Sequence, residues 1–61
     1  MNIREKLLTA QGHINDAMFF DEHPELGLAE MLRARKELNQ AISYLFDKHP
    51  DEAAELMKEA A

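Results

Sequence analysis

The chain contains two near-copies of one hexapeptide, 26 residues apart, and each copy places a proline directly after a histidine. The first copy is Phe20-Asp21-Glu22-His23-Pro24-Glu25, and the second is Phe46-Asp47-Lys48-His49-Pro50-Asp51. The residue before a proline is pushed out of the helical region of backbone angles, so each copy predicts a break between two helices. The two breaks divide the 61 residues into three segments, and each segment carries a helical pattern.

Each copy is interpreted as a corner between two helices. The histidine is expected at the N-cap, the proline at the first helical position, and the aspartate turned back towards nearby backbone amides. The phenylalanine would pack over the corner. The predicted corner residues are Asp21, His23, Pro24, Asp47, His49 and Pro50. A second interpretation, metal binding by the repeated Asp-x-His, rests on a very weak pattern, so we predict no metal ligands and no cofactor. Whether the repeat records a duplication stays open.

The residue composition predicts an all-α protein with a single domain over residues 1–61. Valine and tryptophan are absent, and strong helix formers such as alanine, leucine, glutamate and lysine dominate. A chain of this length buries only about 60% of the surface that its unfolded form exposes. Nine residues are alanine and none is cysteine, so disulfides cannot supply the missing stability. We therefore expect a partner chain or unusually close helix packing.

The expected helices cover about 3–20, 25–47 and 50–59. The first carries an apolar stripe with alternating steps of four and three residues, which consists of Ile3, Leu7, Ala10, Ile14 and Ala17. A second contact face on the same helix would combine Leu8 and Phe19 with Gly12. The second helix begins either before or after Gly27, and the sequence does not decide between these. The third helix is short and must dock against something to be stable.

Short connections favour antiparallel neighbours, so the first two helices are expected to form a hairpin with their apolar stripes facing each other. Arg35 then lies in the middle of the second stripe, where it either reaches solvent or pairs with an acid that fixes register or oligomeric state. Large apolar side chains at both ends of the hairpin need a cover, which predicts a homodimeric helical bundle. The predicted interface residues are Leu8, Phe19, Phe20, Met31, Arg35, Tyr44, Leu45 and Phe46.

The charge pattern limits the location and the partners. The formal net charge is −5, which opposes non-specific binding to nucleic acid or to anionic lipid. No apolar run approaches the length of a membrane span, and residues 1–6 lack the apolar stretch of a signal peptide. We therefore expect a cytoplasmic protein without a membrane partner.

Signals of catalysis are missing from the sequence. There is no cysteine, the two glycines stand alone, and the Glu-x-x-His spacing of di-iron bundles does not occur. The chain is therefore not expected to be an enzyme. The leading hypothesis is a small acidic helical module for protein–protein interaction. It would pair with itself as a homodimer and with an unidentified protein partner, as an accessory or regulatory protein of a bacterium or phage.

The alternative hypothesis is a regulator that binds RNA or DNA. A basic patch would join the start of the first helix to the middle of the second, through Arg4, Lys6, Arg33, Arg35 and Lys36. The net charge opposes this alternative, and so do the neighbouring acids Glu30 and Glu37, which suit helical ion pairs with the same bases.

Overall fold

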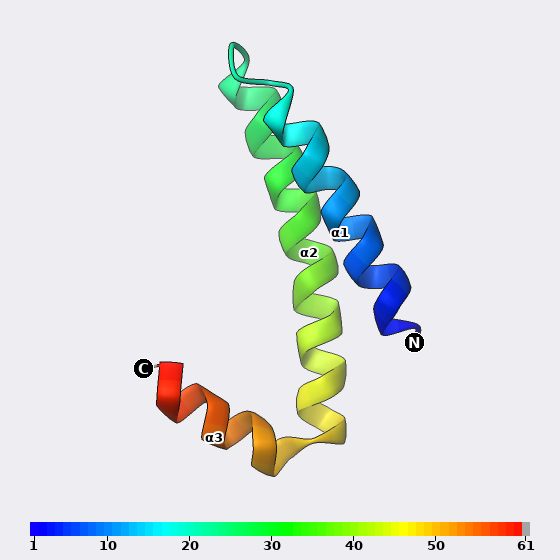
Figure 1. Cartoon of the computed structure of the whole chain (residues 1–61), viewed down its shortest axis with the longest axis vertical. Coiled ribbons are helices and arrows are strands. Elements are labelled where there is room, and N and C mark those ends of the chain that lie inside the picture. The colour runs from blue at the N-terminus through cyan, green and yellow to red at the C-terminus, as the bar shows by residue number, and fades with distance from the viewer. Residues whose placement is uncertain (61) are drawn as a thin grey trace.

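The computed structural model describes residues 1–60, which form three helices and no strand: α1 (Ile3–Met18), α2 (Pro24–Lys48) and α3 (Pro50–Ala60). Helices α1 and α2 lie antiparallel and side by side, and α3 leaves the end of α2 on the side away from α1 (Figure 1). The prediction of an all-α protein built on a helical hairpin is confirmed. Helix α1 ends at Met18, two residues earlier than expected, and Gly27 lies inside α2.

The helix ends follow from local chemistry. The side chain of Asn2 accepts a hydrogen bond of 3.1 Å from the backbone N–H of Glu5, so one free amide of the first turn of α1 is satisfied. Pro24 opens α2, where its missing N–H costs nothing. His23 and His49 have ψ angles of 72° and 62°, outside the helical region, as expected for residues that precede proline.

Small residues form the seam between α1 and α2. Among residues 1–60 the buried side chains all belong to alanine, at Ala10, Ala34, Ala41 and Ala53, and Gly27 is buried as well. Gly27 approaches α1 so closely that an added Cβ would lie 3.7 Å from the carbonyl oxygen of Ala17. The two helices therefore pack through their smallest side chains.

The expectation that the large apolar stripes face each other is wrong. The lengthwise register agrees with it, since His13 lies opposite Glu30 and Lys6 lies opposite Gln40. Each helix is instead rotated about its own axis, so that Ile14 and Met31 lie beside the seam and not in it. The rotation lets small residues approach closely and lets polar side chains pair across the seam.

The molecule is flat and extended for its size. Its Cα atoms span 42 × 27 × 12 Å, with a radius of gyration of 13.9 Å. A compact domain of 61 residues has a radius of gyration of about 10.5 Å. The three helices therefore form a single layer with no second layer to cover it. None of the described helices has the length and apolar character that a bilayer span requires.

Candidate interaction surface

Polar side chains link α1 to α2 along the seam. Lys6 Nζ donates to the side-chain oxygen of Gln40 at 2.6 Å and lies 3.1 Å from a carboxylate oxygen of Glu37. About two turns further along α1, His13 Nδ1 lies 2.7 Å from a carboxylate oxygen of Glu30. A carboxylate can only accept, so Nδ1 carries the proton in this hydrogen bond. These pairs set the lengthwise register of the hairpin.

Glu30 is the centre of this polar network. Its second carboxylate oxygen accepts from the guanidinium of Arg33, one turn along α2. The hydrogen bond from His13 lowers the pKa of Glu30 below its ordinary value of 4.5, and the hydrogen bond and charge of Arg33 act in the same direction against the opposing effect of desolvation. Glu30 is therefore held in its ionised form in the folded chain.

The large apolar side chains gather on one side of the seam, which we call the apolar flank. Each of its residues directly follows a seam residue, so it points about 100° around the helix from the seam. Because α1 and α2 run antiparallel, this 100° turn brings the apolar residues of α1 and those of α2 to the same side of the hairpin. The apolar flank consists of Leu7, Ile14, Met18, Leu28, Met31, Leu38, Ile42 and Leu45. Except for the half-buried Leu38, all of them are exposed.

The exposed area exceeds what a compact monomer would show. The accessible surface is 5041 Å² for a chain of 7.0 kDa. A compact monomer of that mass exposes about 4,000 Å². The excess of roughly 1,000 Å² is close to the ~800 Å² that each partner loses in a standard protein–protein interface.

A groove opens between the end of α2 and the inner side of α3, with a volume of about 490 Å³. Its walls are almost entirely apolar, although His49 and Glu52 also line it. Its lining side chains include Ile42, Leu45, Phe46, Ala53, Leu56 and Met57. Because Ile42 and Leu45 belong to both surfaces, the groove continues the apolar flank around the corner. Helix α3 covers Leu45 and Phe46 only in part, since both remain about 40% exposed.

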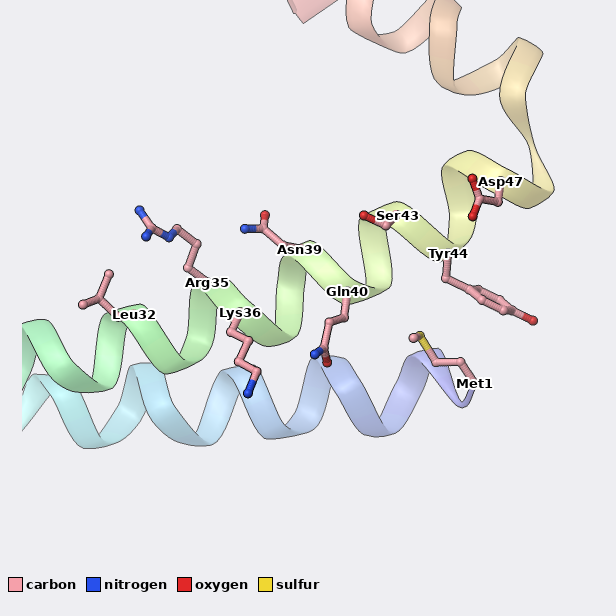
Figure 2. Close-up of a pocket in the computed structure, with 9 residues that line it drawn as sticks. All are labelled: Met1, Leu32, Arg35, Lys36, Asn39, Gln40, Ser43, Tyr44 and Asp47. Atoms are coloured by element: carbon pink, nitrogen blue, oxygen red, sulfur yellow. The ribbon is translucent and has the colours of Figure 1, made fainter.

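A second hollow of about 630 Å³ runs along α2, and most of the residues that line it are polar (Figure 2). Arg35, Asn39 and Ser43 project away from α1, while Lys36 and Gln40 point towards it (Figure 2). The side chains diverge and do not meet at one point, so the hollow does not present a binding site for a small ligand.

The predicted interface residues fall on different surfaces. Met31, Arg35 and Leu45 border or belong to the apolar flank, and Phe46 lines the groove. Leu8 and Phe19 lie on the outer side of α1, where Phe19 is 84% exposed. Phe20 is half-buried at the first corner, with its Cβ 3.7 Å from where a Cβ on Gly27 would be. Tyr44 is half-buried, and Lys48 Nζ lies 5.6 Å from its ring centre.

The two hexapeptide copies fold differently. The first forms a turn in which His23 N–H donates to the carbonyl of Phe20 at 3.0 Å, whereas residues 46–48 of the second remain helical. Asp21 and Asp47 were expected to accept from backbone amides, and within residues 1–60 neither makes such a hydrogen bond. The reason is that nearby backbone N–H groups already donate to backbone carbonyls. For example, the N–H of His49 donates to the carbonyl of Leu45 at 2.8 Å. Pro24 and Pro50 each begin a helix as expected.

The residues of the predicted basic patch do not share one surface. Lys6 and Arg33 are paired with Glu37 and Glu30. Helical position puts Lys36 on the polar side of the seam, opposite the apolar flank, whereas Arg35 follows Ala34 on the apolar side. Arg4 points to the outer side of α1 by the same spacing. The structure therefore brings only part of the patch together, and acids neutralise that part.

The oxygen and nitrogen donors of His13, Asp16 and Glu30 lie within 4.8 Å of one another, which is near enough for a shared cation. Both carboxylate oxygens of Glu30 already accept hydrogen bonds, from His13 and Arg33. A cation would have to displace these two partners. The cluster is therefore explained by the hydrogen bond that joins His13 to Glu30 across the two helices.

Sequence reasoning placed Ala10 and Ala17 in the stripe that faces the second helix, but it missed the residues on the α2 side of the seam. These residues are Gly27, Ala34 and Ala41, and their signal was a heptad spacing of small residues that Ala10 and Ala17 share. Comparisons with protein-family models, curated proteins and solved structures give no significant match to this chain. A function must therefore be inferred from the surfaces described above.

Proposed function

We propose that the chain is a protein–protein interaction module that acts as a homodimer, and that the apolar flank is its contact surface. The observation that carries this proposal is the mismatch between the two sides of the fold. The buried side chains among residues 1–60 are alanines, while the large leucine, isoleucine, methionine and phenylalanine side chains stay in contact with water. Burial of apolar surface contributes about 25 cal/mol per Å². A second layer over this flank would recover what the hairpin leaves exposed.

A second copy of the chain is the simplest cover. The flank is flat, because α1 and α2 lie side by side in one layer, and a two-fold axis can bring two such flanks together (Figure 1). The excess area of roughly 1,000 Å² per copy is sufficient for a standard interface. The outer side of α1, with Leu8 and Phe19, would remain free for another protein.

The test is sedimentation equilibrium from low micromolar to near-millimolar concentration, with two matched variants. Leu28 lies on the apolar flank and Leu8 on the outer side of α1, and both are 53% exposed. Fully burying a leucine stabilises by about 1.5–3 kcal/mol. About half of that remains available at Leu28, so Leu28→Ala should cost ~2 kcal/mol per dimer, or about 30-fold in Kd.

The control variant Leu8→Ala changes the same atoms and the same helix propensity, and its Kd should stay within about threefold of the wild type, as expected for a surface substitution. Circular dichroism would establish that both variants remain helical. A wild type that stays monomeric throughout the concentration range would refute the proposal. If Leu28→Ala and Leu8→Ala changed the Kd equally, the apolar flank would not be the contact surface of the dimer.

A further inference from the structure

Helix α3 is attached to the hairpin by a single residue outside the helical region, His49. Its one buried residue is Ala53, while Leu56 and Met57 are 64% and 58% exposed. An isolated helix of this length is marginal in water. The apolar side of α3 therefore needs more contact than the open groove on its own chain provides.

The charges around α3 and on the apolar flank are complementary. Helix α3 carries the acids Asp51, Glu52, Glu55 and Glu59 against the single base Lys58. By helical spacing, Glu52 and Glu59 lie along one edge of its apolar side, and Glu52 lines the groove. Arg35 lies along α2 between Leu28 and Ile42, at the outer edge of the apolar flank, and its side chain projects away from α1 (Figure 2). It has no ion-pair partner within residues 1–60.

We infer that α3 of each copy lies across the apolar flank of the other copy, with Glu52 facing Arg35 of that copy. This exchange rests on the proposed function and adds to it the element that completes the interface. Leu56 and Met57 contact the exposed flank of the second copy, and the acidic edge of α3 neutralises Arg35 at the outer edge of that flank. A buried arginine–carboxylate pair would also fix the register of the two copies.

The pair cannot form within one chain in this fold. Glu52 lines the groove together with Phe46. Phe46 lies about 16 Å along α2 from Arg35, at a rise of ~1.5 Å per residue. Energetic coupling between Glu52 and Arg35 would therefore report a contact between copies.

The test is a charge-exchange cycle, measured as the dimer Kd by sedimentation equilibrium on the full chain. Arg35→Glu and Glu52→Arg should each weaken the dimer by about tenfold or more, because each leaves a like charge facing a like charge. The double variant should recover at least about tenfold of the combined loss. Glu55→Arg is the matched control, since Glu55 lies on the solvent side of the same helix, 4.0 Å from Lys58, and should leave Kd unchanged.

The outcomes separate the inference from the proposed function. A dimeric wild type whose Kd is unaffected by Glu52→Arg and by Leu56→Ala overturns the exchange of α3 and leaves the dimer standing. Single variants that weaken the dimer without recovery in the double variant overturn the pairing of Glu52 with Arg35. A wild type that stays monomeric at every concentration, with α3 closed on its own groove, overturns both.

Discussion

Replacement of Gly12 by alanine tests which side of α1 is free. Gly12 lies in the middle of α1, and a Cβ added there would meet no atom within 4 Å. Glycine in a helix costs about 0.5–1 kcal/mol relative to alanine, because its backbone loses more freedom on folding. With no clash to set against this gain, Gly12→Ala should raise the free energy of unfolding by about 1 kcal/mol. In a domain of this size that corresponds to a rise in Tm of about 4–8 °C.

The assay is thermal unfolding followed by circular dichroism. All variants must be compared at one protein concentration, since the Tm of a dimer depends on concentration. Gly27→Ala is the companion variant. It gains the same stabilisation from the reduced backbone freedom of the unfolded chain, but its Cβ would lie 3.7 Å from both the Ala17 carbonyl oxygen and the Phe20 Cβ. These are ordinary contact distances, so Gly27→Ala should be tolerated and should stabilise the chain no more than Gly12→Ala.

A lower Tm for Gly12→Ala would refute the reasoning. It would mean that another chain packs closely on the outer side of α1, where Leu8 and Phe19 are exposed. The contact surface of the dimer would then be that side and not the apolar flank. A higher Tm with an unchanged dimer Kd is the expected result.

Two further predictions concern the seam. Ala34→Leu should lower the free energy of unfolding, measured by urea titration, by about 1–3 kcal/mol, because the added carbons force α1 and α2 apart. The control Ala54→Leu, at an exposed position of α3, should change the free energy of unfolding little. Equal effects of the two variants would contradict a seam packed through alanines. The lowered pKa of Glu30 stabilises the fold above its ordinary value of 4.5, and this contribution is lost as the pH falls through the folded-state pKa. The difference in unfolding free energy between wild type and Glu30→Gln should therefore shrink on acidification below that value. A difference that does not change with pH would contradict the stabilisation of the ionised Glu30 by its hydrogen bonds with His13 and Arg33.

The helices themselves were predictable because their signals are local. Asn2 caps the first helix, and the prolines at positions 24 and 50 begin the other two, as the amino-acid sequence predicts. The same local reasoning fails where one motif has two outcomes. Phe20 lies in a turn and Phe46 lies in a helix, although the residues around them are nearly the same. The first corner turns back so that Phe20 lies beside Gly27 of α2, with its Cβ 3.7 Å from where a Cβ on Gly27 would be.

The candidate site was predicted in part. The sequence pointed to Met31, Arg35 and Leu45 as exposed residues of a contact surface, and the structure leaves all three exposed. It did not separate them from Leu8 and Phe19, which lie on another side of the hairpin. Apolar periodicity identifies which residues share a face of one helix. It does not say which face meets the neighbouring helix.

What the sequence determined by itself is the set of three helices, their ends and the amphipathic character of each, because these depend on residues within a few positions of one another. Only the tertiary structure decided the rotation of α1 and α2. In both helices a line of small residues and a line of large apolar residues lie about 100° apart, so either line could face the partner. The choice depends on pairs distant in the chain, Lys6 with Glu37 and His13 with Glu30. These pairs place the alanines inside the seam, and they leave the larger apolar side chains for another protein surface.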